Sequence, residues 1–235
     1  MSVNKIVILT GAGISAESGI KTFRDAGGLW EDHPVEQVAT PEGYAADPKL
    51  VQRFYNLRRA ALGKVQPNAA HIALAKLQTQ MNTRGGEALI VTQNVDDLHE
   101  RGGAKHVVHM HGELKRVFCT ACDHHIDCED DITVETICPA CKVIGTTRPD
   151  IVWFGEIPYH MDAIERAVQT CDLFVSIGTS GAVYPAAGFV QLAKHYGAKT
   201  LELNLEVSQG SYHFDETRLG KAGTLVPAWV EEVLE

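Results

Sequence analysis

A short glycine turn, Gly11-Ala12-Gly13, is the first group of residues whose spacing could serve chemistry. It follows the apolar run at residues 6–9. Together with Ala16 it fits the loose G-x-G-x-x-G/A pattern, in which small residues let the backbone approach a pyrophosphate at a helix N-terminus. A dehydrogenase would need a second strand with a terminal acidic residue about 20 residues further on, and none is recognisable here. The turn therefore indicates a dinucleotide site that is not built like that of a dehydrogenase.

Four cysteines form a second group. Cys119 and Cys122 make one C-x2-C pair, and Cys138 and Cys141 make another after 15 intervening residues. This spacing predicts a tetrahedral Zn²⁺ site, which is structural because four thiolates leave no open position for water. The neighbouring residues that could replace one of these ligands are His124, His125 and Cys128.

Polar residues also follow four apolar runs that are expected to be strands. They are Gln93, Asn94 and Asp96 after the second run, His111 after the third, Gly178, Thr179 and Ser180 after a later one, and Asn204 and Glu206 after the last. Ligands of open α/β sheets bind at the carboxyl ends of the strands. Four such loops therefore predict one shared cleft.

Two histidines compete for a catalytic role in this cleft. Histidine can accept a proton near neutral pH. His111 ends a strand, precedes a glycine and comes just before the cysteine pairs, which favours it. His109 would share its side of a strand by alternation, so the pattern alone does not choose between the two.

The elements that must position these residues alternate between strands and helices. The predicted strands are residues 6–9, 88–92, 106–109, 150–154, 173–177 and 200–204, and the predicted helices are 67–80, 161–170, 184–196 and 227–234. Mostly apolar strands that alternate with helices predict a doubly wound parallel α/β sheet. Residues 25–65 and 116–147 break this rhythm and are expected to be insertions into a single domain.

Composition narrows the function classes. The chain has 235 residues, 45% of them hydrophobic, and a net charge of −9 without a basic block. No apolar run is long enough for a membrane span, and the first strand begins too early to leave room for a signal peptide. We therefore expect a cytoplasmic protein, a monomer, with no membrane association and no direct binding to nucleic acid.

The chain resembles the sirtuins, the NAD-dependent protein-lysine deacylases, and its short termini resemble those of the bacterial members. The matching segments are residues 11–20 and 22–24, 92–96, 111–113, the four cysteines, 152–156, 178–180 and 204–206. The resemblance implies a Rossmann-type part (about 1–28, 66–115 and 148–235), a helical insert (about 29–65) and a zinc module (about 116–147). It also implies that NAD is consumed while an acyl group leaves a lysine, which gives nicotinamide and O-acyl-ADP-ribose.

The resemblance implies a role for each matching residue. His111 would be the catalytic base, and Val152 and Phe154 would flank the peptide substrate. The residues that would contact NAD are Gly11, Ala12, Gly13, Ser15, Phe23, Arg24, Trp30, Gln93, Asn94, Asp96, Gly178, Thr179, Ser180, Asn204, Leu205, Glu206 and Ala222.

Tyr55 and Arg58 address the choice of acyl group. Their i, i+3 spacing on a predicted helix places them on one face, where an arginine fork and a phenol could bind a carboxylate. Tyr-x-x-Arg here, together with a small Ala39, resembles the class III subgroup that removes succinyl and malonyl groups. Arg59 is expected to point elsewhere, into solvent.

Other functions remain open from sequence alone. Within the family these are an acetyl-only deacetylase and a weak mono-ADP-ribosyltransferase. Outside it, a nicotinamide-dependent dehydrogenase could share the glycine turn, and a zinc-ribbon adaptor could share the cysteines. The stretch 119–141 holds no lysine or arginine, which disfavours a nucleic-acid module.

Overall fold

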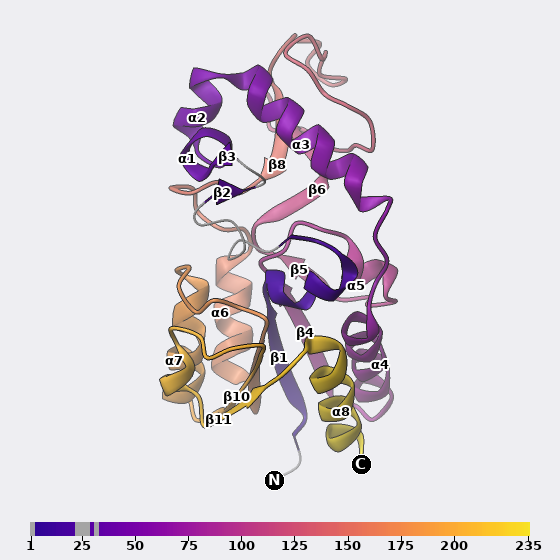
Figure 1. The fold of residues 1–235 in the computed structure, drawn as a ribbon, viewed down its shortest axis with the longest axis vertical. Coiled ribbons are helices and arrows are strands. Elements are labelled where there is room, and N and C mark those ends of the chain that lie inside the picture. The colour runs from indigo at the N-terminus through magenta and orange to yellow at the C-terminus, as the bar shows by residue number, and fades with distance from the viewer. Residues whose placement is uncertain (1–2, 22–28, 31–32) are drawn as a thin grey trace.

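A computed structural model describes residues 3–21, 29–30 and 33–235 of the chain, without the side chains of residues 29 and 30. Figure 1 shows two parts joined end to end, with both termini at the far end of the larger part. The larger part contains a six-stranded parallel sheet in the order β11-β10-β9-β1-β4-β5. Its strands are β1 (Lys5–Thr10), β4 (Glu87–Thr92), β5 (Val107–His109), β9 (Leu173–Ile177), β10 (Lys199–Asn204) and β11 (Glu216–Leu219).

The central strand β1 shows why this sheet needs helices on both faces. Ile6 and Ile8 pack into one apolar cluster, with α4 (Ala69–Thr83) and α8 (Ala222–Leu234). Val7 and Leu9 point the other way, toward α6 (Met161–Thr170) and α7 (Phe189–His195). Successive side chains of a strand alternate between faces, so an unbroken apolar run demands cover on both sides. Figure 1 shows these helix pairs on opposite sides of the sheet.

The smaller part holds a three-stranded antiparallel sheet and the helical insert. The sheet has the order β7-β6-β8, with β6 (Gly112–Cys119), β7 (His125–Asp127) and β8 (Thr147–Ile151). Its other elements are β2 (Leu29–Trp30), β3 (His33–Pro34), α1 (Val35–Val38), α2 (Pro41–Ala46) and α3 (Pro48–Leu62). The short α5 (Leu98–Arg101) and the 3₁₀ turns Ala12–Ile14, Ala16–Ser18, Ala186–Gly188 and Ser211–His213 complete the described elements.

Two of the sequence-based assignments are wrong. Of the parallel strand predicted at residues 150–154, residues 150–151 are instead the end of β8, which pairs antiparallel with β6 in the smaller part, and residues 152–154 lie in no strand. Its apolar residues are buried by α3 rather than by the two helix layers, since Ile151 and Trp153 belong to the cluster that contains Val51 and Phe54. The missing sixth strand is β11, whose polar sequence gives no apolar signal. The glycine turn leads into two 3₁₀ turns, Ala12–Ile14 and Ala16–Ser18.

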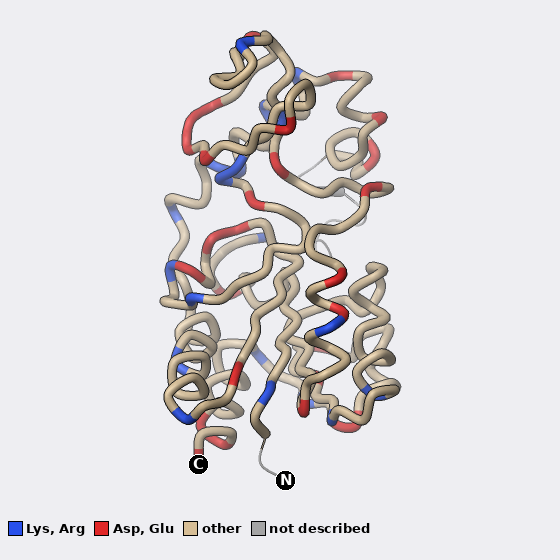
Figure 2. The backbone as a smooth tube through the Cα atoms, turned by 180° about the vertical axis from the view of Figure 1, so that it is seen from behind, with Lys and Arg blue, Asp and Glu red and all other residues tan. Residues whose placement is uncertain are grey.

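The surface carries charges of both signs. Figure 2 shows acidic and basic residues interspersed over both parts of the molecule. Among the helices that the structure describes, none combines the length and the apolar character needed to cross a membrane.

Candidate functional site

One large cavity lies between the two parts and has a volume of about 920 Å³. Its wall is formed by the glycine turn, the loop after β4, the segment after β5, the end of β8, the loops after β9 and β10, and the start of α8. All of these except β8 and α8 are carboxyl ends of strands in the parallel sheet. The cleft that the sequence predicts at this edge is therefore present.

The glycines of the first turn permit a close approach of two loops. The backbone N–H of Gly13 donates to the carbonyl of Gly178 at 2.9 Å. A Cβ on Gly13 would lie 2.7 Å from the Cα of Gly178, and Gly178 itself has a φ of +62°. The small residues are thus required by the neighbouring loop, and the same packing keeps the backbone exposed to the cavity.

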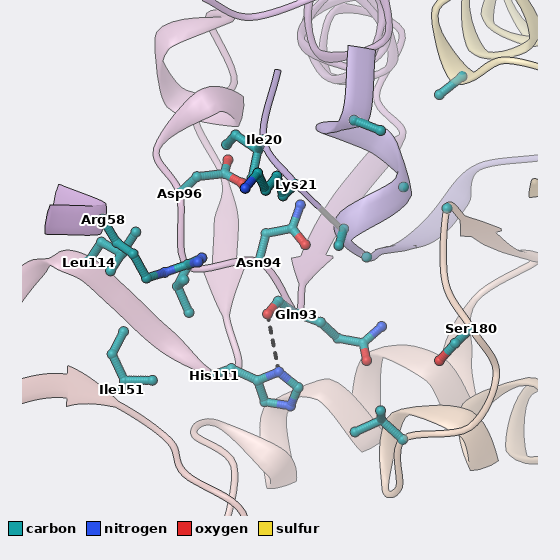
Figure 3. A pocket seen from close by; sticks show the side chains of 18 of the residues that line it. Ile20, Lys21, Arg58, Gln93, Asn94, Asp96, His111, Leu114, Ile151 and Ser180 are labelled. Atoms are coloured by element: carbon teal, nitrogen blue, oxygen red, sulfur yellow. Dashed lines mark hydrogen bonds between the residues drawn. The ribbon is translucent and has the colours of Figure 1, made fainter. Parts of the chain in front are cut away.

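His111 is held in the protonation state that a general base needs. Its Nδ1 lies 3.1 Å from the carbonyl oxygen of Gln93. A carbonyl can only accept, so Nδ1 carries the proton and Nε2 is left as an acceptor. Burial lowers the pKa of His111 below its ordinary value, which keeps the ring neutral near pH 7. Figure 3 shows the ring at the cavity wall beside Gln93.

His109 is occupied elsewhere. Its Nε2 lies 2.8 Å from a carboxylate oxygen of Glu100, and its Nδ1 lies 3.3 Å from the carbonyl of Asn94. β5 ends at His109, so the alternation expected from the sequence does not extend to His111, which lies in a turn. Only His111 of the two lines the cavity, among the residues that the structure describes.

A buried polar network supports the loop after β4. The hydroxyl of Ser15 donates to Asp96 at 3.1 Å and accepts from the amide of Asn94 at 3.1 Å. Asp96 and Asn94 line the cavity, whereas Ser15 lies fully buried behind them. Burial raises the pKa of Asp96. Ser15 therefore positions two candidate cofactor-binding side chains from behind.

His71, which no sequence motif singled out, extends this network. Its Nε2 lies 3.4 Å from the hydroxyl of Ser15, and its Nδ1 accepts from the backbone N–H of Asn68 at 3.3 Å. A protonated ring would place a second N–H against that donor. Burial lowers the pKa of His71 to about 4. The signal in the sequence is Asn68, an N-cap residue three positions before His71 at the start of α4.

His71 predicts an acid sensitivity of the fold. The unfolded chain binds a proton at His71 below the ordinary pKa of 6.5, whereas the folded chain does so only near 4. The stabilising contribution is therefore complete above the ordinary pKa and is lost as the pH falls toward 4. Relative to His71→Gln, the wild type should lose about 2 kcal/mol of unfolding free energy between about pH 7 and about pH 5. Urea unfolding measures this loss. The exposed His106, changed to Gln, serves as control, and an equal pH dependence of wild type and His71→Gln would contradict the assignment.

The far end of the cavity is lined by the loops after β9 and β10 and by the start of α8. The described lining residues there include Gly178, Ser180, Asn204, Leu205, Glu206 and Ala222. The amide of Asn204 donates to the carbonyl of Thr179 at 2.7 Å, which fixes the two loops to one another. Thr179 is buried behind this wall and bonds to Ser176.

The opposite end of the cavity reaches into the smaller part. Arg58 and Ala39 line it together with Val152 and Phe154. Figure 3 shows the Arg58 side chain extending from α3 into the cavity beside Leu114. The backbone N–H of Phe154 donates to the carbonyl of Ala39 at 2.9 Å, which joins the helical insert to the segment after β8.

Two α3 residues lie differently from their expected positions. Tyr55 is fully buried, and it is absent from the described residues of the cavity wall; its hydroxyl accepts from the indole N–H of Trp153 at 2.9 Å. The expectation that Arg59 is solvated is wrong, because it is 3% exposed. Arg59 donates to the carbonyls of Leu114 and Asp130, and so ties α3 to the cysteine-bearing part. The two acceptors, Leu114 on β6 and Asp130 after β7, lie far from Arg59 in the sequence, so the local pattern did not indicate them.

The four cysteines meet in space. Their sulfur atoms all lie within 4.8 Å of one another, and two of the pairs, Cys119–Cys141 and Cys122–Cys138, are separated by 3.7 Å. A tetrahedral Zn²⁺ with Zn–S bonds of about 2.3 Å would separate its sulfurs by about 3.8 Å. The same distance is far beyond the roughly 2.05 Å of a disulfide. The donor set and its spacing therefore fit zinc.

The alternative ligands lie outside this cluster. The thiol of Cys128 donates to the carbonyl of Asp130, and His125 bonds to Asp150 at 2.7 Å. The two cysteine pairs have matching turns. The backbone N–H of Asp123 donates to the carbonyl of Cys119, and that of Lys142 donates to the carbonyl of Cys138. Phe23, Arg24 and the side chain of Trp30 lie outside the described residues.

Comparison with known proteins identifies the family of this chain. The model of the Sir2 family matches residues 11–185. A protein of Pasteurella multocida named NAD-dependent protein deacylase is 56% identical over 232 residues, which cover 98% of each chain. A protein of the same name from Bdellovibrio bacteriovorus is 57% identical over 232 residues, covering 98% of this chain and 97% of its own.

Solved structures of Sir2 proteins have the same fold as this chain. A complex of a Sir2 homologue with NAD has a TM-score of 0.88 and 37% identity, covering 99% of this chain and 91% of its own. A Sir2 protein bound to an acetylated peptide has a TM-score of 0.81 and 28% identity, covering 98% of this chain and 93% of its own. A parallel sheet with a cavity at the carboxyl ends of its strands places the chain among the open α/β proteins. The chain belongs to the Sir2 family.

Proposed function

We propose that this protein is an NAD-dependent protein-lysine deacylase that removes acetyl, succinyl and malonyl groups. The observation that carries the proposal is the position of His111, which has an acceptor nitrogen and lies at the wall of a cavity of about 920 Å³. The same cavity extends from the glycine turn to Arg58 in the smaller part, and we call the end at Arg58 the acyl end. The named relatives act on proteins with NAD, and membership in their family leaves the dehydrogenase and adaptor alternatives without support.

His111 acts as the general base. NAD, when bound, supplies a nicotinamide–ribose bond, and cleavage of that bond exposes C1′ of the ribose to attack by the acyl oxygen. The Nε2 of His111 then takes a proton from a ribose hydroxyl, and the Gln93 carbonyl stabilises the imidazolium through the Nδ1 hydrogen bond. The lowered pKa of His111 keeps this base unprotonated at neutral pH.

The other site residues position the reactants. Gln93, Asn94 and Asp96 line the wall beside His111 and are proposed to hold the ribose and the nicotinamide. Gly11, Ala12 and Gly13 are proposed to contact the phosphates, and the loops at Ser180 and Asn204 the adenosine. Val152 and Phe154 are proposed to flank a peptide that adds as a strand. Four cysteines would hold a Zn²⁺ that supports the smaller part and takes no part in bond making.

Arg58 is proposed to select acyl groups that end in a carboxylate. It is half-buried, and at its end of the cavity the wall includes the apolar side chains of Leu114 and Ile151. A guanidinium in such surroundings pairs with a carboxylate through two parallel hydrogen bonds. The small Ala39 leaves room for the longer acyl chain.

Replacing Arg58 by Met should lower kcat/KM for a succinyl-lysine peptide by roughly ten- to a hundredfold, since a hydrogen bond to a charged group contributes about 1.5–3 kcal/mol. Activity toward the acetyl-lysine peptide should fall far less. Steady-state kinetics with both peptides measure the ratio, and the exposed Arg53 on the same helix, changed to Met, is the matched control. An equal loss for both peptides would count against the assignment.

The activity itself is tested by mass spectrometry. Acetyl- and succinyl-lysine peptides are incubated with the protein and NAD. The bare peptide, nicotinamide and O-acyl-ADP-ribose should form in equal amounts. Loss of the acyl group without NAD would refute the proposal, and ADP-ribose on the protein substrate would favour the transferase alternative. Monomeric state, cytoplasmic location and lack of nucleic-acid binding stay predictions.

A further inference from the structure

Trp153 connects Tyr55 to the cavity. Trp153 is one of the residues that line the cavity, although only 2% of it is exposed. Its N–H donates to the Tyr55 hydroxyl at 2.9 Å, and the two rings are tilted with centroids 6.4 Å apart. The position of the Tyr55 oxygen therefore depends on the position of the indole.

Arg148 holds the indole from the side of β8. Its guanidinium carbon lies 3.4 Å from the centroid of a Trp153 ring and 4.8 Å from that of Phe118. Stacking of this kind is worth more in a desolvated place, and Arg148 is 7% exposed. Arg148 does not line the cavity in the described part of the chain, so any effect on a ligand must act through Trp153.

Glu156 completes the support. Its two carboxylate oxygens accept from Arg148 at 2.7 and 3.1 Å, a bidentate pair. One of them also accepts from the backbone N–H of Trp153 at 2.8 Å, across a turn in which Gly155 has a φ of +91°. The second Arg148 nitrogen donates to the Ile151 carbonyl at 2.7 Å. Trp153 is therefore fixed both at its backbone and at its ring.

We propose that Trp153 is a specificity-determining residue for acyl groups that end in a carboxylate, with Arg148 as its positioning residue and Glu156 as the ion-pair partner that holds Arg148. The proposal rests on the proposed role of Arg58. Tyr55 and Arg58 lie three residues apart on one face of α3, and the buried Tyr55 hydroxyl accepts from the Trp153 indole behind the wall. This contact fixes Trp153 in the same wall as Arg58, where a carboxylate would bind. An acetyl group has no polar atom beyond its amide and gains nothing from that placement.

Trp153→Phe tests the proposal because it keeps an aromatic ring beside Arg148 and removes the N–H. The ratio of kcat/KM for succinyl-lysine to that for acetyl-lysine peptide should fall about three- to tenfold, the effect of one neutral hydrogen bond, and the change should appear in KM. Trp229→Phe is the matched control, since Trp229 is equally buried but lies in α8 among the core residues of the larger part. Its ratio should equal that of the wild type.

Arg148 is tested separately. Arg148→Lys keeps the charge beside Glu156 and should retain more of the ratio than Arg148→Met. In an Arg58→Met background, neither Arg148→Met nor Trp153→Phe should change the ratio further, because the effects of coupled residues are not additive. A purely structural role would lower both activities together in every background.

The outcomes separate the two proposals. A wild type that removes succinyl groups, with an unchanged ratio in Trp153→Phe, overturns the role of Trp153 and leaves the deacylase proposal standing. A full additional loss in the Arg58→Met background overturns it as well. A wild type without activity on succinyl-lysine overturns the acyl preference and this inference together, whereas activity on acetyl-lysine would still support the deacylase.

Discussion

Replacing His111 with Ala is expected to lower kcat by about two to four orders of magnitude, the usual contribution of a positioned general base. The side chain contacts the Gln93 carbonyl through Nδ1 and presents Nε2 as an acceptor, so the alanine variant loses the nitrogen that would take the proton. Binding of NAD should change little, because the loops proposed to contact its phosphates and adenosine lie elsewhere on the wall. Stopped-time assays of O-acyl-ADP-ribose and calorimetric titration with NAD measure the two effects.

His109→Ala is the matched control. His109 contacts the Glu100 carboxylate and the Asn94 carbonyl, so its replacement should lower the melting temperature. The value of kcat should fall far less than in His111→Ala. Comparable losses of kcat in the two variants, with folding intact, would contradict the assignment of His111 as the base.

The pH profile of the wild type gives an independent reading. The base must be unprotonated, so activity is present above the pKa of His111 and is lost as the pH falls through it. Burial lowers that pKa, which places the acid limb of kcat below the 6.5 of an ordinary histidine. An acid limb above that value would contradict the buried, neutral ring that the geometry shows.

Local patterns predicted most of the parallel sheet and the positions of the polar loops. The apolar run of β1 determines a strand covered on both faces, and its carboxyl end then becomes a binding edge for physical reasons that any open α/β sheet shares. The cysteine spacing was equally informative, because the two knuckles are local structures whose pairing needs only a short hairpin. The four sulfurs lie together as predicted.

The remaining features depend on contacts between distant segments. Nothing near Arg59 in the sequence indicates that Leu114 and Asp130 would accept its hydrogen bonds, so it was expected in solvent. The network of Arg148, Glu156 and Trp153 likewise exists only once β8 lies against α3. Residues 150–154 were assigned to the wrong sheet for the same reason, since apolarity reports burial but does not say which partner provides it.

Removing the metal should have the second large effect. Four sulfurs within 4.8 Å of one another cannot all stay ionised without a cation, and the cluster closes a segment with few apolar residues of its own. Structural Zn²⁺ contributes about 10–16 kcal/mol in small zinc-binding peptides, so loss of one ligand should unfold the module. Cys141→Ser should therefore lose its zinc, and backbone amides of residues 119–147 should lose protection in hydrogen exchange. Activity should fall with them, because β8 continues directly into Val152 and Trp153 of the cavity wall.

Cys128→Ser separates this role from a general need for thiols. Its sulfur bonds to the Asp130 carbonyl outside the cluster, so this variant should keep one zinc per chain by elemental analysis and keep its exchange protection. The strands of the larger part should stay protected in Cys141→Ser, since the two apolar clusters that cover β1 and its neighbours contain none of the four clustered cysteines. If Cys141→Ser kept its zinc and Cys128→Ser lost it, Cys128 rather than Cys141 would be the ligand. If Cys141→Ser lost exchange protection across the whole chain, the two parts would not unfold separately. Substitution of Zn²⁺ by Co²⁺ with activity preserved is the expected companion result, because the closed thiolate set holds the fold and leaves the proton transfer to His111.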